Sequence, residues 1–282
     1  MVARTVVAWD GSAKADEALR WGVARERQLG QTIHIVRVVD ESNTTLVSSF
    51  GGRDHLVDAA FDTVAEKAHE VRRAHPELTV STDVVFGSPV EELRKFAAAD
   101  SVLVVGTDKR SVSKRQQRWS VGSRLASSPR GPVAMIPRHV QGERSGVVVG
   151  VTGSEESTRA AFFAAAEASR WSEELHVVLV WSEPPVEGVR GLNPEFTRWL
   201  RVAHEELLEE ILLPVRQSYP AVTIRAHLEN DSPVPALQRY AHTSSLLIVG
   251  SRRRGSIGRL LLGSVGHALV LGIECPIIVL GP

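Results

Sequence analysis

Short apolar runs alternate along the chain with longer segments in which apolar residues recur every three or four positions. The runs predict buried parallel strands, and the periodic segments predict amphipathic helices. In the first periodic segment the apolar residues fall at helical spacing, which gives one buried stripe: Ala15, Ala18, Leu19, Gly22 and Val23. Up to residue 138 the expected strands are Thr5–Trp9, Ile33–Val39, Val80–Phe86, Val102–Val105 and Val133–Ile136.

The pattern of the first part is repeated later in the chain. Four features recur 144 positions further on: Ser88-Pro89 at Ser232-Pro233, Gly106 at Gly250, Ser120 at Ser264, and Pro132 at Pro276. The chain is therefore an internal duplication. We predict a first domain over residues 1–138, a linker over 139–145 and a second domain over 146–282. The length suits two compact domains, each large enough to bury a core.

The second copy repeats the order of elements. Strands are expected at Gly146–Val151 and Leu175–Val180, and a helix at Asn193–Tyr219 that Pro214 kinks or ends early. Ser88 and Ser232 each precede a proline and are expected to be helix N-caps. Regular alternation of strands and helices predicts an α/β fold with two tandem five-stranded parallel sheets, flanked by helices and Rossmann-like.

The composition limits which partners and which cellular location can be expected. The chain has 33 basic and 33 acidic residues, so its zero net charge argues against nucleic acid and anionic membranes as partners. No apolar run approaches the roughly 20 residues that span a bilayer. A single cysteine excludes an intramolecular disulfide framework, and the N-terminus lacks a signal-peptide core, so a cytoplasmic location is expected.

The segment from Gly250 to Val265 joins an apolar strand to a helix through a loop rich in glycine and arginine. Glycines let the backbone approach a ligand, and the first N–H groups of a helix favour negative charge. We expect Ser264 to cap the helix and to donate its hydroxyl. This segment therefore predicts a phosphate-binding site.

Three motifs together resemble the universal stress protein family. The first strand ends in Asp10-Gly11-Ser12, Gly87-Ser88-Pro89 precedes a helix, and the loop after the fourth strand approaches the pattern Gly-x2-Gly-x9-Gly-Ser. The resemblance covers essentially the whole chain. It implies an adenine nucleotide α-hydrolase-like fold, with ATP, with or without Mg²⁺, held between the first strand and the glycine loop.

The two copies depart from the family pattern in different ways. In the second copy Arg253 replaces a glycine and Thr152 replaces the aspartate, and in the first copy Lys109 and Trp119 replace two glycines. Trp119 would fill the space of a triphosphate, which predicts a degenerate first site. The second site is predicted to comprise Thr152, Gly250, Ser251, Arg252, Arg253, Gly263, Ser264 and Val265. The degenerate site comprises Asp10, Gly106, Lys109, Trp119 and Ser120.

Three functions remain open on the sequence. The first is a regulatory protein that binds ATP or a related nucleotide in its second domain. The second is a nucleotide-free interaction module that presents basic loops to a protein partner. The third, a slow ATP-hydrolysing or phosphoryl-transferring enzyme, has little support because no catalytic constellation is present.

Other reactive residues have structural interpretations. His34 and His176 occupy equivalent strands, and the ten histidines show no metal-binding spacing. Cys275 is expected to be a small buried side chain. The last strand of each copy, Val133–Ile136 and Ile277–Leu280, is expected to pair with the other within the chain, giving a pseudo-twofold unit that can dimerise further.

Overall fold

The computed structural model describes residues 4–27, 32–40, 53–108, 120–138, 142–182, 194–253 and 260–281, without the side chains of residues 53–56, 252–253 and 260–261. The first half contains β1 (Arg4–Ala8), α1 (Ala13–Arg27), β2 (Thr32–Val39), α3 (Arg53–Ala74), β3 (Thr79–Phe86), α4 (Pro89–Phe96), β4 (Ser101–Thr107), α5 (Val121–Ser127) and β5 (Val133–Pro137). The second half contains β6 (Val147–Val151), α6 (Glu155–Trp171), β7 (Leu175–Trp181), α7 (Pro194–Ser218), β8 (Ile224–Asn230), α8 (Pro233–Ala241), β9 (Leu246–Gly250), β10 (Arg252–Arg253), β11 (Leu260–Leu261), α9 (Ser264–Leu271) and β12 (Ile277–Leu280).

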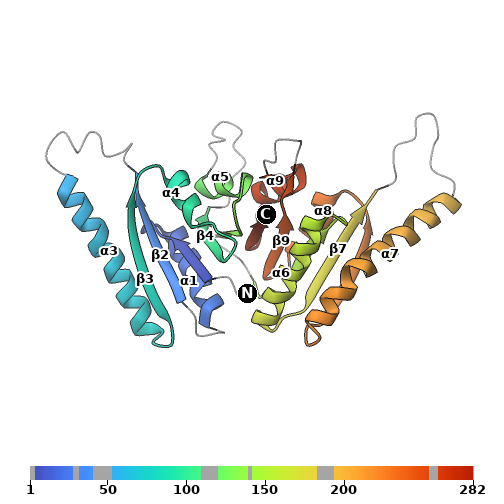
Figure 1. Ribbon diagram of the computed structural model, residues 1–282, viewed down its shortest axis with the longest axis horizontal. Coiled ribbons are helices and arrows are strands. Elements are labelled where there is room, and N and C mark those ends of the chain that lie inside the picture. The colour runs from blue at the N-terminus through green and yellow to red at the C-terminus, as the bar shows by residue number, and fades with distance from the viewer. Residues whose placement is uncertain are drawn as a thin grey trace.

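Ten of the twelve described strands form one sheet in the order β3-β2-β1-β4-β5-β12-β9-β6-β7-β8 (Figure 1), and β10 and β11 form a separate two-stranded sheet. Pairing is parallel within each half, and each half contributes five strands in the same order. The predicted fold class, two tandem five-stranded parallel sheets with flanking helices, is confirmed.

The two halves meet through an antiparallel pair of strands, β5 and β12. Ala134 of β5 lies opposite Ile278 of β12, and each is the other's equivalent in the 144-residue repeat. The pseudo-twofold axis therefore passes through this residue pair. The predicted pairing of the two last strands within the chain is present, and it leaves neither strand as a free edge.

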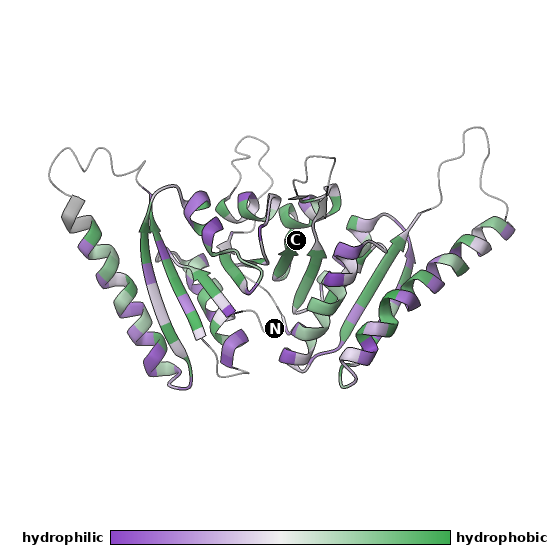
Figure 2. Cartoon of the chain, in the orientation of Figure 1, coloured by the Kyte–Doolittle hydropathy of each residue, from purple (hydrophilic) through white to green (hydrophobic). Residues whose placement is uncertain are grey.

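Helices cover both faces of the sheet, and each face has its own core. Alternate residues along a strand point to opposite faces, so Val102 and Val104 of β4 join the core under α1, α3, α6 and α7. Leu103 and Val105 join the core under α4, α5, α8 and α9. Both cores run across the junction between the halves. Figure 2 shows the resulting pattern, with hydrophobic strands inside and more polar outer helices.

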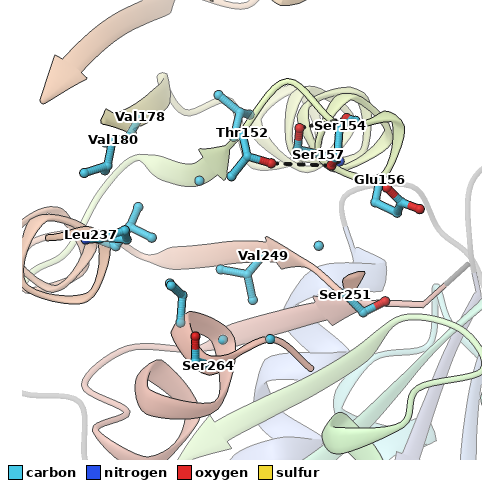
Figure 3. Close-up of a pocket in the computed structure, with 17 residues that line it drawn as sticks. Thr152, Ser154, Glu156, Ser157, Val178, Val180, Leu237, Val249, Ser251 and Ser264 are labelled. Carbon is cyan, nitrogen blue, oxygen red and sulfur yellow. Dashed lines mark hydrogen bonds between the residues drawn. The ribbon is translucent and has the colours of Figure 1, made fainter. Parts of the chain in front are cut away.

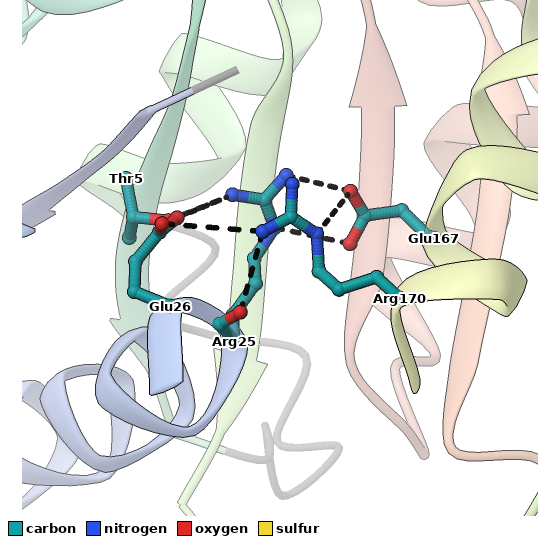
Figure 4. Close-up of polar contacts among 5 residues, drawn as sticks. All are labelled: Thr5, Arg25, Glu26, Glu167 and Arg170. Carbon is teal, nitrogen blue, oxygen red and sulfur yellow. Dashed lines mark hydrogen bonds and ion pairs between the residues drawn. The ribbon is translucent and has the colours of Figure 1, made fainter. Parts of the chain in front are cut away.

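A buried charge cluster crosses the same junction on the α1 and α6 side (Figure 4). The Arg25 guanidinium donates to the Glu167 carboxylate through Nε at 3.0 Å and Nη2 at 2.6 Å. Its Nη1 donates to Thr5 Oγ1 and to Glu26 Oε1, both at 2.8 Å. Arg170 Nη1 donates to the Arg25 carbonyl at 3.3 Å. Burial is the main cause that lowers the pKa of Arg170, and the Arg25 charge adds to it.

The stripe predicted for α1 is buried in full, but the sequence analysis missed that Arg25 and Glu26 are buried with it. Isolated buried charges are costly, whereas two arginines and two glutamates that contact one another offset much of that cost. Apolar periodicity alone does not reveal such a set, because its members look like an ordinary solvated face.

The sequence predicts that Pro214 kinks α7 or ends it early, and the early end is wrong, because the helix continues through Pro214 to Ser218. A proline removes one hydrogen bond to the carbonyl four residues earlier, here that of Glu210. Glu210 is exposed, so water can satisfy its carbonyl. Buried Leu212 and Val215 on either side of the proline hold the helix against the sheet.

Smaller details refine the sequence predictions. Ser88 and Ser232 are the N-caps of α4 and α8, as expected, but neither side chain makes the capping hydrogen bond. Cys275 is buried, and burial raises the pKa of its thiol to about 12, which confirms its interpretation as a small core residue. In the described part of the chain, no helix combines the length and apolar character needed to cross a membrane.

The two histidines at the β7–β8 edge make the stability of the second half depend on pH. His176 Nδ1 and His227 Nε2 are 3.0 Å apart and share a hydrogen bond. Burial lowers the pKa of both, and for His227 the neighbouring His176 lowers it further. A base with a lowered pKa binds its proton more weakly in the folded protein than in the unfolded chain, so acidification through about pH 6.5 costs stability.

We expect the free energy of unfolding to fall between pH 7.5 and pH 5.5, by up to about 1.4 kcal/mol per pH unit for each proton involved. His227→Phe should reduce this fall, because it removes one of the two protonation sites. Urea titrations at several pH values measure it. Tyr240→Phe is the control, since Tyr240 packs on the same ring and has a pKa of about 12. An unchanged pH dependence in His227→Phe would contradict the assignment.

Candidate functional site

A pocket of about 200 Å³ lies in the second half, where β6 and β9 end (Figure 3). The two strand ends and the N-terminus of α9 form its polar side, with Thr152, Gly250, Ser251 and Ser264. Its apolar side consists of Val178, Val180, Val249 and Leu237. Carboxyl ends of neighbouring parallel strands are the usual ligand site of an α/β sheet.

The N-terminus of α9 differs from the prediction. Ser264 is the first helical residue, and the N-cap is Gly263, which has no side chain to make a capping hydrogen bond. In the first half the equivalent helix α5 is capped by Ser120, whose hydroxyl accepts from Ser123 N at 3.1 Å. The α9 terminus therefore presents its first N–H groups without a capping side chain, in the wall of the pocket.

The polar side chains at the ends of β6 and β9 form few hydrogen bonds with the protein. Ser251 is 1% exposed, and its hydroxyl has no hydrogen-bond partner within the described residues. Thr152 Oγ1 makes only a long contact of 3.4 Å with Ser154 Oγ. A buried hydroxyl without a partner costs roughly 1–3 kcal/mol. Of the two, the exposed Thr152 hydroxyl is the one that a polar ligand in this pocket can reach.

The first half has the corresponding pocket, with a volume of about 470 Å³. Eight of its lining residues are the 144-residue equivalents of residues that line the second pocket: Pro89, Leu93, Val105, Gly106, Thr107, Ser120, Val121 and Gly122. The duplication has therefore preserved both sites as cavities.

Two charged groups of the first pocket, Asp10 and Lys14, have partners within the protein. Asp10 Oδ1 accepts from Ser12 N at 2.9 Å and from the Ser12 hydroxyl. Lys14 Nζ lies 3.9 Å from Asp108 Oδ2, and its equivalent in the second pocket is Glu156. The first pocket thus holds a lysine and three carboxylates, those of Asp10, Asp40 and Asp108, where the second has Glu156 and hydroxyls.

Six of the eight residues predicted for the second site line its pocket: Thr152, Gly250, Ser251, Gly263, Ser264 and Val265. Arg252 and Arg253 form β10, a two-residue strand paired antiparallel with β11, and their side chains lie outside the description. The sequence analysis treated this segment as a plain loop. Of the residues predicted for the degenerate site, Asp10, Gly106 and Ser120 line the first pocket, whereas Lys109 and Trp119 lie outside the described residues.

Sequence reasoning missed the apolar walls and the helix residue Glu156. The repeat register aligns two of the lining residues, because Pro233 and Leu237 follow Ser232 just as Pro89 and Leu93 follow Ser88, but it does not show that they face a pocket. Among the residues that the structure describes, no group of three or more His, Cys, Asp or Glu side chains could hold a metal ion.

The loop of the second pocket is attached to the first half. Leu262 N–H donates to the Ser127 carbonyl at 3.0 Å. Ser127 is the last residue of α5, and Leu262 immediately precedes the N-cap of α9. Figure 1 shows α5 and α9 side by side at the junction.

Comparison with known proteins gives the same assignment for both halves. The model of the universal stress protein family matches residues 1–137 and again 144–281. The chain belongs to the universal stress protein family. Two universal stress proteins of Mycobacterium tuberculosis (strain ATCC 25618 / H37Rv) resemble it along its whole length. One is 29% identical over 294 residues, covering 97% of this chain and 95% of that protein, and the other is 27% identical over 296 residues, covering 97% and 93%.

A solved structure supports the fold of this universal stress protein. The crystal structure of a universal stress protein from Archaeoglobus fulgidus DSM 4304 matches with a TM-score of 0.69 at 20% identity, and the match covers 98% of this chain and 97% of that one. The resemblance drawn from the sequence motifs is thus confirmed at the level of family and fold.

The two strand-end glycines should differ in their tolerance of a side chain. A Cβ on Gly106 would overlap the backbone carbonyl of Lys14 in α1, whereas a Cβ on Gly250 would lie 3.1 Å from the Glu156 carbonyl. We expect Gly106→Ala to lower the free energy of unfolding by about 2–4 kcal/mol and Gly250→Ala by about 1 kcal/mol or less. Chemical denaturation of both variants tests this. Equal losses would contradict the difference in helix packing.

Proposed function

We propose that this universal stress protein is a regulatory protein that binds an adenine nucleotide, such as ATP with or without Mg²⁺, in the pocket of its second half. The observation that carries the proposal is the uncapped N-terminus of α9 at the pocket wall. Backbone N–H groups and the helix dipole at such a terminus favour a phosphate. Because Gly263 has no side chain, a phosphate can approach these N–H groups directly.

The remaining lining suits the rest of a nucleotide. Val178, Val180 and Leu237 offer an apolar wall for the base, and the exposed Thr152 offers a hydroxyl for the sugar. The volume of about 200 Å³ is smaller than most drug-sized ligand pockets, so only part of a nucleotide would be enclosed. The phosphates would then lie at the mouth, beside Gly263, Ser264 and Val265.

We place the degenerate site in the first half, although its cavity is larger. Ser120 uses its hydroxyl to cap α5, and the Asp10 carboxylate accepts hydrogen bonds from Ser12. These groups would have to give up protein partners to contact a ligand. A group that exchanges a protein hydrogen bond for one to a ligand gains little free energy. We therefore infer that the first half has kept the fold but binds a nucleotide more weakly.

The decisive variant is Gly263→Asp. The backbone of Gly263 has φ −61° and ψ 166°, close to the φ −64° and ψ 158° of the N-cap Ser120, so an aspartate can adopt this backbone conformation without strain. An aspartate at the N-cap stabilises a helix and repels a phosphate. We expect a melting temperature equal to or above that of the wild type and an ATP affinity lower by about tenfold or more, measured by isothermal titration with Mg²⁺.

Ser120→Asp is the matched control, because it places the same carboxylate at the equivalent helix of the first half. It should leave the affinity unchanged. If Ser120→Asp rather than Gly263→Asp weakens binding, the nucleotide binds in the first half. Two binding sites would show that Trp119 does not close the first site, and no binding at millimolar ATP would favour the nucleotide-free interaction module.

A further inference from the structure

The buried faces of α1 and α6 are equivalent surfaces of the two halves. All seven buried residues of α1 have their counterparts, 142 positions later, among the seven buried residues of α6. Arg25 is the counterpart of Glu167, and these two residues are hydrogen-bonded to each other across the junction. A residue that contacts its own counterpart lies at the pseudo-twofold axis.

The duplicated chain therefore carries opposite charges at one symmetry-related position. The Arg25 and Glu167 side chains are 1% and 2% exposed, and their contact is bidentate. The strand pair on the same axis has diverged in size, with Ala134 opposite Ile278. Where the first half contacts the second half, opposite charges meet and a small residue lies beside a large one. Two copies of the same half would instead bring together like charges and residues of equal size.

The same geometry shows what a pair of identical halves would encounter. Two first halves joined through β5 would bury Arg25 against a second Arg25, and two second halves joined through β12 would bury Glu167 against a second Glu167. Each Arg25 would keep Thr5 and Glu26 of its own half, and each Glu167 would keep Arg170, but both would lose their bidentate partner and would face a like charge instead. The loss of one partner of a buried ion pair, with a like charge in its place, destabilises an interface strongly. In the present chain each of these charges faces the opposite charge instead.

We propose that Arg25 and Glu167 specify the pairing of the first half with the second half and exclude the pairing of either half with another copy of itself through the β5 or β12 edge. The partner of each edge is fixed by one buried charge pair on the axis. This role is independent of nucleotide binding.

Two single substitutions reproduce the excluded pairings inside the intact chain. Glu167→Arg creates the arginine pair of two first halves, and Arg25→Glu creates the glutamate pair of two second halves. We expect each to lower the melting temperature by about 10 °C or more. The charge-swapped double variant Arg25→Glu/Glu167→Arg should recover at least about half of that loss, although Thr5 and Glu26 lose their contacts with Arg25.

Hydrogen exchange locates the effect. In the like-charge variants the amides of β12 should exchange faster than those of β2, which is distant from the junction in the sheet order. Arg201→Glu is the control, because it places like charges at the exposed Arg201–Glu205 pair of α7, and its melting temperature should shift by less than about 2 °C. The proposal is overturned if a like-charge variant melts with the wild type, or if the charge swap is no more stable than the weaker single variant.

Discussion

The antiparallel pairing of β5 with β12 is the constraint on which the architecture depends. It converts two five-stranded sheets into one, lets both cores run across the junction, and brings α1 to α6 on one face and α5 to α9 on the other. Each partner in this pairing is the sequence equivalent of the other. On the axis itself, Ala134 contacts its counterpart Ile278 and Arg25 contacts its counterpart Glu167, so a substitution at one of these positions changes its contact with its own counterpart.

The fold could be predicted from the sequence because its signals are local and occur twice. Continuous β-branched runs such as Val102–Val105 identify strands buried on both faces, and the repeat spacing aligns the elements of the two halves. Strand and helix boundaries agree within a few residues. Pro214 misled the prediction because packing on both sides of a proline can outweigh one lost hydrogen bond.

The candidate site could be predicted only in part. The glycine and serine positions were found because ligand-approaching backbone needs residues of that kind, and they do line the pocket. The apolar walls could not be assigned to the site, since valine and leucine on a strand look the same whether they face a core or a cavity. The helix start at Ser264 and the burial of Arg25 both depend on tertiary contacts that no local pattern encodes.

The hydrogen bond from Leu262 to Ser127 means that the second pocket is not made by the second half alone. One end of the loop at this pocket is hydrogen-bonded to a helix whose other end lines the first pocket. A truncated chain that kept only residues 146–282 would retain every lining residue of the second pocket, yet it would lose the anchor one residue ahead of Gly263. The two halves therefore form a single structural unit, in which α5 of the first half holds the loop at the pocket of the second half.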